Sequence, residues 1–165
     1  MTLQKENSDT GSSISLDEKD IAILKILQDD ALATVREIAA AVHLSTTPVH
    51  ERIKRMEEAG VISCYAALVD PAKVKKGLMV ICYVSLKEHG KRTGSKFVKL
   101  IQEMNEVVEC YSISGEFDFM LKVVAENMND YYDFHVNKLS QVENIGQLQS
   151  VFVMGKIKET HRLIF

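Results

Sequence analysis

The sequence has few cysteines and no apolar run long enough to cross a membrane. Its three cysteines, Cys64, Cys82 and Cys110, are an odd number set far apart, and the chain begins without a charged and then apolar leader. The most apolar run, from Gly77 to Leu86, is far shorter than the roughly 20 residues of a transmembrane helix. We therefore expect a cytoplasmic protein with no membrane segment.

An excess of basic residues is also lacking. The 20 lysines and arginines are outnumbered by 23 aspartates and glutamates, so the formal net charge is −3. This balance excludes a uniformly basic nucleic-acid-binding polypeptide, and any surface for nucleic acid has to be a local patch. The apolar content of 46% is sufficient for packed cores in one large or two small domains.

Signals of catalysis and metal binding are scarce too. The sequence contains no glycine-rich phosphate loop and no nucleophile elbow. Its cysteines share no close spacing with one another or with His50, His89 or His135. We therefore expect no enzyme, no metal site and no cofactor, and we interpret the cysteines as buried, inert thiols.

Three helices are predicted after a polar N-terminal segment. Residues 1–15 are rich in Ser, Thr and Asn and have no apolar period, which predicts a flexible tail. From Leu16 to about Ala59, apolar residues recur at three- and four-residue spacing in three segments. The second segment opens with a capping box, Thr34 to Glu37, and the third opens at Ser45. Only residues 43–44 separate these two helices, a spacing typical of a helix-turn-helix.

The apolar period changes after Gly60. Residues 61–69 are predicted to form a strand that completes a winged helix-turn-helix domain over residues 16–70, and residues 71–77 are predicted to be a linker. The domain over residues 78–165 has predicted strands at 78–86, 107–114, 119–125 and 148–154 and predicted helices at 94–104 and 129–139. This βαββαβ order indicates an α+β, ferredoxin-like domain whose antiparallel sheet has both helices on one face. The other face needs a cover, so we expect self-association.

The third helix has one apolar and one polar side. Val49, Ile53 and Met56 fall at i, i+4 and i+7 and are expected to face the core. Bases are contacted from the N-terminal half of such a helix, and phosphates by its cations. The predicted base contacts are Thr46, Thr47 and His50, and the predicted phosphate contacts are Arg52, Lys54 and Arg55.

Two other interpretations of this helix remain open. Its polar side could be an ordinary solvated face, with Arg52 paired to an acid inside the helical bundle. The chain could also be a ligand-binding and oligomerisation module whose helical domain contacts protein instead of DNA. Only DNA binding predicts duplex affinity that weakens steeply with salt.

Several motifs in sequence order resemble one family. They are Leu16-Asp17-x-x-Asp20, Leu44-Ser45-Thr46-Thr47-Pro48-Val49-x-x-Arg52-Ile53-Lys54-Arg55-Met56, Gly60-Val61-Ile62-x-x-Tyr65, Ser114-Gly115-Glu116-Phe117-Asp118-Phe119 and Phe152-Val153-Met154-x-x-Ile157-Lys158. With these motifs the chain resembles the Lrp/AsnC, or feast/famine, regulators over nearly its whole length after residue 15.

The resemblance implies a sequence-specific DNA-binding transcriptional regulator. It implies a homodimer formed through the βαββαβ domain that often assembles further into an octamer. It also implies that an amino acid or a related small effector binds between dimers and changes the assembly or its affinity for double-stranded DNA.

The resemblance also suggests effector contacts. The family's Gly-x-x-Asp falls on Gly115 and Asp118, where a glycine permits close backbone approach and a carboxylate can pair with an α-ammonium group. The surrounding wall is predicted to include Phe117, Met128 and Ser150. Without the family, Gly115 and Asp118 could equally belong to an ordinary hairpin turn.

The chain departs from the family at two positions. His43 stands where many members have a glycine between the two helices, so we expect a positive φ there at some cost. Members often have an arginine near Leu32, and its absence puts a DNA or interhelix contact there in doubt.

Overall fold

The computed structural model describes residues 14–88 and 90–165, which form two compact units. The helical unit extends to Ala67 and includes the C-terminal residues Glu159–Phe165, and the sheet unit is Leu68–Lys158. The tail predicted over residues 1–15 lies outside the described residues except for its last two. Of these, Ile14 is partly buried against the core of the helical unit.

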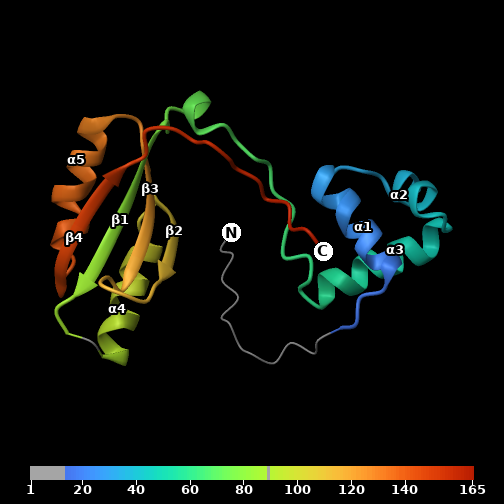
Figure 1. The fold of residues 1–165 in the computed structure, drawn as a ribbon, viewed down its shortest axis with the longest axis horizontal. Coiled ribbons are helices and arrows are strands. Elements are labelled where there is room, and N and C mark those ends of the chain that lie inside the picture. The colour runs from blue at the N-terminus through green and yellow to red at the C-terminus, as the bar shows by residue number, and fades with distance from the viewer. Residues whose placement is uncertain (1–13, 89) are drawn as a thin grey trace. The chain divides into compact units, whose positions relative to one another are not determined.

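The helical unit contains the three predicted helices (Figure 1). They are α1 (Glu18–Asp29), α2 (Val35–Val42) and α3 (Thr46–Glu58). Their apolar stripes form one core that includes Ile23, Ile38, Ala39, Val42, Val49 and Met56. The capping box at α2 is also confirmed, because the Glu37 N–H donates to Thr34 Oγ1 at 3.3 Å and the Thr34 N–H donates to a Glu37 carboxylate oxygen at 2.8 Å.

The strand predicted over residues 61–69 is wrong. The segment has no strand structure, and Val61, Tyr65 and Leu68 are exposed. Its β-branched and aromatic residues favour a strand, but a strand also needs a neighbour to pair its N–H and C=O groups. Within the described part of the chain no segment pairs with it. The predicted linker that follows contains a short 3₁₀ helix, η1 (Pro71–Val74), capped by the Asp70 carboxylate.

The sheet unit has the predicted βαββαβ order. Its elements are β1 (Leu78–Leu86), α4 (Lys91–Gln102), β2 (Val107–Ser112), β3 (Phe119–Ala125), α5 (Met128–Asn137), the 3₁₀ turn η2 (Leu139–Gln141) and β4 (Ile145–Phe152). The strands are antiparallel in the order β2-β3-β1-β4, which is the ferredoxin-like arrangement. The strand β4 begins three residues earlier than predicted because its pairing with β1 continues to Leu86 and Ile145.

Alternate residues of β1 and β3 separate the two faces of the sheet. On one face, Val80, Val84 and Leu121 are fully buried beneath Phe97 of α4 and Phe134 of α5. The intervening side chains lie on the other face and are only partly buried; they are Met79, Ile81, Tyr83, Met120, Lys122 and Val124. The two helices therefore cover one side of the sheet, as predicted (Figure 1).

The last residues of the chain contact α1, although the sequence placed them in the βαββαβ domain. The Gln28 side-chain amide donates to the Leu163 carbonyl at 3.2 Å and accepts from the Leu163 N–H at 2.6 Å. Arg162 forms an ion pair with Asp29. A side-chain amide can satisfy both polar groups of one backbone residue, a contact that has no signature in local sequence pattern.

The two N-cap positions of the helix-turn-helix should differ in their contribution to stability. Thr34→Ala removes the cap hydrogen bond of α2, so we expect the free energy of unfolding to fall by about 1 kcal/mol. Ser45 occupies the N-cap of α3 without a side-chain cap hydrogen bond, so Ser45→Ala should lower the free energy of unfolding by much less. Urea denaturation followed by circular dichroism measures both, and equal losses would contradict this assignment.

Candidate nucleic-acid interface and effector loop

The turn between α2 and α3 sets the position of α3. His43 adopts the left-handed conformation predicted for it, with φ 55° and ψ 51°, and the Leu44 N–H donates to the Ala39 carbonyl at 3.0 Å. This closes α2 in the manner of a glycine-capped helix. The side chain of Lys19 adds a second cap, since its Nζ donates to the Val42 carbonyl at 2.7 Å.

The α3 helix exposes the side that the sequence predicts to be outward. Val49 and Met56 are fully buried and Ile53 is partly buried against them. Thr46, Thr47, His50 and Lys54 are among the exposed polar residues of the helix, which also include Glu51, Glu57 and Glu58. Lys54 has only a loose pair with Glu58, at 3.7 Å, and its side chain is 64% exposed. Hydroxyl, imidazole and ammonium groups thus lie together on one solvent-facing surface.

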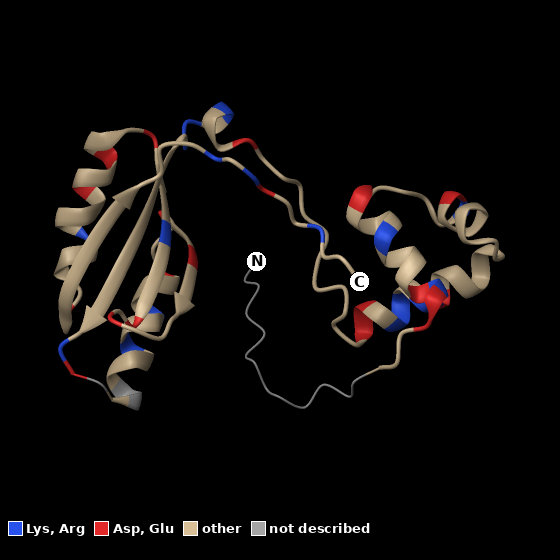
Figure 2. Cartoon of the chain, in the orientation of Figure 1, with Lys and Arg blue, Asp and Glu red and all other residues tan. Residues whose placement is uncertain are grey.

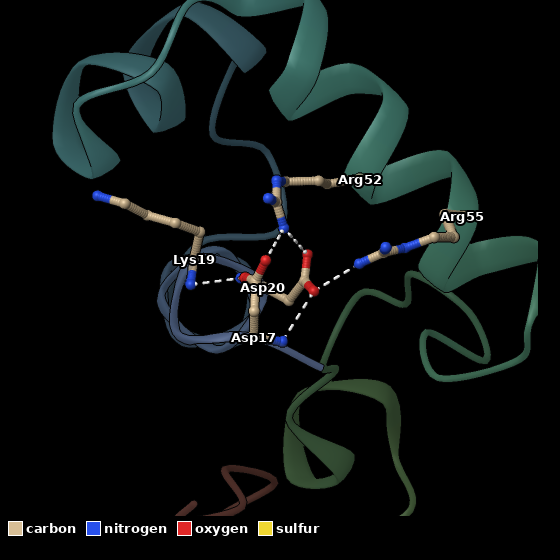
Figure 3. Close-up of polar contacts among 5 residues, drawn as sticks. All are labelled: Asp17, Lys19, Asp20, Arg52 and Arg55. Atoms are coloured by element: carbon tan, nitrogen blue, oxygen red, sulfur yellow. Dashed lines mark hydrogen bonds and ion pairs between the residues drawn. The ribbon is translucent and has the colours of Figure 1, made fainter. Parts of the chain in front are cut away.

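The two arginines of α3 point away from this surface and toward α1. Figure 3 shows Arg52 and Arg55 reaching Asp20 of α1, whose side chain is completely buried. The Arg52 Nη1 atom lies 2.7 Å from Asp20 Oδ1 and 2.7 Å from Asp17 Oδ2, and Arg55 Nη2 lies 2.5 Å from Asp20 Oδ2. Arg52 therefore has the role of an ion-pair partner inside the bundle, which the sequence left open beside phosphate contact.

The same cluster closes the first turn of α1. Asp17 Oδ1 accepts from the backbone N–H groups of Lys19 and Asp20 at 2.9 Å each, and the Asp17 N–H donates to Asp20 Oδ2 at 3.0 Å. Hydrogen bonds from the Asp20 N–H and from Arg52 lower the pKa of Asp17. Hydrogen bonds to Asp20 and Asp17 raise the pKa of the Arg52 guanidinium. The contact therefore stabilises the charged forms of both Asp17 and Arg52.

The sequence pattern did not indicate that Asp20 is buried. Figure 2 shows acidic and basic residues side by side where α1 meets α3. The spacing Asp17-x-x-Asp20 matches a capping box, and this signal could have placed Asp20 in the first helical turn. It could not show that the turn packs against Arg52 and Arg55.

Three of the predicted effector residues come together in the connection between β2 and β3. Gly115 has φ +125°, and a Cβ atom built there would have no neighbour within 4 Å. Asp118 Oδ2 accepts from the Leu86 N–H at 2.7 Å. The ring of Phe117 lies 5.5 Å from that of Tyr83. The loop is therefore anchored to β1 by backbone and aromatic contacts and leaves its glycine open to approach.

Ser150 and Met128 are not brought to this loop within one chain. Ser150 lies opposite Cys82 on the helix-facing side of the sheet, and its hydroxyl is 2.5 Å from Tyr131 Oη. Met128 begins α5 and is 54% exposed. Met128 lies beyond the C-terminal end of β3, whereas Asp118 directly precedes its first residue, and a strand of this length separates its ends by about 20 Å.

One buried polar contact lies behind this part of the sheet. Tyr131 Oη is 3.2 Å from the Cys82 sulfur, and burial raises the pKa values of the Tyr131 hydroxyl and the Cys82 thiol. The prediction of buried thiols is correct for Cys82 and wrong for Cys64 and Cys110, which are exposed. Among the described residues there is no group of three candidate metal ligands and no helix long and apolar enough to cross a bilayer.

Comparison with known protein families and their curated members gives matches over both units. Residues 16–63 match the winged helix-turn-helix DNA-binding model, and residues 79–163 match the Lrp/AsnC ligand binding domain. The chain is 32% identical over 148 residues to the DNA-binding transcriptional activator DecR of Escherichia coli K12, covering 90% of this chain and 97% of that protein. It is 34% identical over 146 residues to the leucine-responsive regulatory protein of Rhizobium meliloti, covering 88% of this chain and 94% of that protein.

Solved structures give the same result for the fold. The transcriptional regulator NMB0573 of Neisseria meningitidis, in complex with L-Met, superposes with a TM-score of 0.86 at 33% identity, covering 91% of this chain and 97% of that one. An AsnC family transcriptional regulator from Agrobacterium tumefaciens superposes with a TM-score of 0.85 at 38% identity, covering 90% and 97%.

Proposed function

Because the chain belongs to the Lrp/AsnC family of transcriptional regulators, we propose that it binds double-stranded DNA through α3 and responds to an amino acid through its sheet unit. The observation that carries the proposal is the exposed N-terminal half of α3, with Thr46, Thr47 and His50 facing solvent on a helix anchored by a buried apolar seam. It is a regulator and not an enzyme. As a DNA-binding regulator it is proposed to act in the cytoplasm.

The DNA-reading surface combines base contacts and one clear phosphate contact. Thr46, Thr47 and His50 offer hydroxyl and imidazole groups to base edges in the major groove. Lys54 lies on the same side of the helix with an exposed ammonium group suited to phosphate. The alternative of a protein-binding helical domain has no such support, since relatives that match both units are named as DNA-binding proteins or transcriptional regulators.

The proposed effector is an amino acid bound at the Gly115–Asp118 loop. The relative from Neisseria meningitidis binds L-Met, which has the α-ammonium and α-carboxylate groups common to all amino acids. The Asp118 carboxylate suits the ammonium group, and the backbone at Gly115 permits close approach. Phe117 supplies an apolar wall. A site that also includes Met128 requires a second subunit, while the Ser150 hydroxyl is already engaged by Tyr131.

Self-association is proposed to occur through the sheet face that α4 and α5 leave uncovered. Its partly buried apolar side chains, among them Ile81, Tyr83 and Met120, form the centre of that face. Pairing two such faces in a homodimer removes apolar surface from water. Assembly of dimers into an octamer, which the family resemblance suggests, would place effector loops from different dimers together.

DNA binding is tested with duplexes that the protein itself selects from a random pool. We expect the affinity to fall steeply with salt, and Lys54→Ala to reduce the slope of log K against log salt by about 0.9 for each α3 engaged. Lys25, an exposed lysine of α1, provides the matched control, and Lys25→Ala should change the slope less. No detectable duplex binding at low salt would contradict the proposed function.

Effector binding is tested by a thermal-shift screen against the common amino acids, since a ligand of the folded state raises its apparent stability. Asp118→Asn keeps an oxygen to accept from the Leu86 N–H but removes the charge. We expect it to weaken effector binding at least about tenfold, the loss of one charge-assisted hydrogen bond, with basal DNA binding retained. Glu116→Gln removes a carboxylate from the same loop and should leave the thermal shift caused by the effector unchanged. An unchanged response in Asp118→Asn would remove Asp118 from the site.

The interface is tested by placing a charge at its centre. Ile81 pairs across the sheet with Lys122, so a carboxylate there has a cation beside it and the monomer should still fold. Ile81→Glu is expected to weaken dimerisation by at least about tenfold, since burying one such side chain contributes about 1.5–3 kcal/mol. Leu32→Glu makes the same kind of change at a side chain that is 90% exposed and should leave association unchanged in sedimentation velocity runs. Equal behaviour of the two variants would place the interface elsewhere.

A further inference from the structure

The cations of α3 fall into two groups with different surroundings. Lys54 is exposed beside Thr47 and His50, whereas Arg52 and Arg55, three residues apart, lie on the flank of α3 that faces α1 (Figure 3). The Arg52 side chain is only 25% exposed and Arg55 is 48% exposed. The only buried charged residue in the described part of the chain, Asp20, lies between them.

We propose that Asp20 is a positioning residue for DNA recognition, which holds Arg52 and Arg55 against α1 and thereby keeps both guanidinium groups from binding phosphate. This inference rests on the proposed function and adds a determinant of specificity to it. Each carboxylate oxygen of Asp20 accepts a hydrogen bond from one arginine. Oδ1 accepts from Arg52, and Oδ2 accepts from Arg55 and also from the Asp17 N–H.

Burial gives this contact its strength. A carboxylate with no solvent exposure has no water to replace a lost partner, so withdrawing both arginines would leave an uncompensated buried charge. The planar guanidinium group suits this arrangement because its several donors lie in fixed directions. A second acid, Asp17, holds Arg52 from the solvent side. The cluster therefore fixes the rotation of α3 about its own axis relative to α1.

The charged residues of α3 outside this cluster indicate how the cluster affects the affinity for DNA. With Arg52 and Arg55 held by Asp17 and Asp20, the other charged residues of the helix are Lys54, Glu51, Glu57 and Glu58. Phosphate contacts supply most of the affinity for any sequence, whereas base contacts supply discrimination. Holding two cations away from phosphate lowers the non-specific affinity, and a fixed α3 keeps Thr46, Thr47 and His50 aligned with the bases.

The first test is Asp20→Asn, which preserves shape and removes the charge. Binding is measured on a duplex selected by the wild-type protein and on a scrambled duplex of equal length, over a range of salt. We expect affinity for the scrambled duplex to rise and its salt slope to steepen by about 0.9 to 1.8 per α3, because Arg55 is released from Asp20 and Arg52 keeps its ion pair with Asp17 only. The ratio of specific to non-specific affinity should fall at least about tenfold, as when one base contact is lost. A residue that only stabilised the fold would weaken binding to both duplexes without a steeper slope, and that result would overturn the proposal.

The second test leaves the buried carboxylate with a partner, so it does not depend on how well Asp20→Asn folds. Arg55→Gln changes a half-exposed side chain while Arg52 still binds Asp20, and Lys54→Gln changes its neighbour. We expect Lys54→Gln to reduce the salt slope by about 0.9 per α3, and Arg55→Gln to leave the slope unchanged while lowering the specific to non-specific ratio. Thermal melting monitors the fold of each variant.

The outcomes separate the two proposals. Equal loss of slope in Arg55→Gln and Lys54→Gln would identify Arg55 as a phosphate contact and overturn the positioning role, with DNA binding itself intact. A wild-type protein that binds neither duplex at low salt would overturn the proposed function, and the positioning role with it.

Discussion

The buried carboxylate of Asp20 is the contact on which the helical unit depends. An acid with no solvent exposure is tolerated only where donors surround it, and here the donors come from α3 and from the N-terminal turn of α1. The apolar seam of Val49 and Met56 holds α3 onto the core, but such a seam permits rotation and sliding more readily than a set of directed hydrogen bonds. The apolar side chains therefore fix where α3 lies on the core, and the ion pairs fix its rotation about its own axis.

The sheet unit depends on a different constraint, the alternation of side chains along β1 and β3. One set is buried under α4 and α5, and the other set forms a face that these helices leave only partly buried. The same residues that make a two-layer fold stable therefore leave a surface suited to association. We propose that assembly and effector binding are linked through this surface, because Met128 and the Gly115–Asp118 loop can share a site only with help from another subunit.

The segment over residues 61–69 illustrates how a strand-forming sequence differs from a strand. Val61, Tyr65 and Leu68 have the side chains that favour extended pairing, yet they are exposed in a single chain. Local preference selects the backbone conformation, but hydrogen bonding across strands completes it. The prediction failed here because pattern reasoning has no information about whether a neighbour is present.

Sequence pattern alone determined the three helices, the βαββαβ order and the capping box at Thr34, because each depends on residues within a few positions of one another. The left-handed turn at His43 was predicted from the family resemblance. Sequence pattern also determined which side of α3 faces solvent, since helical spacing fixes that once the apolar residues are known. Only the tertiary structure decided that Arg52 and Arg55 belong with Asp20, that Leu163 binds Gln28, and that Met128 lies far from Asp118. Those relations join residues distant in the chain, and their partners are selected by packing and burial, which no local pattern records.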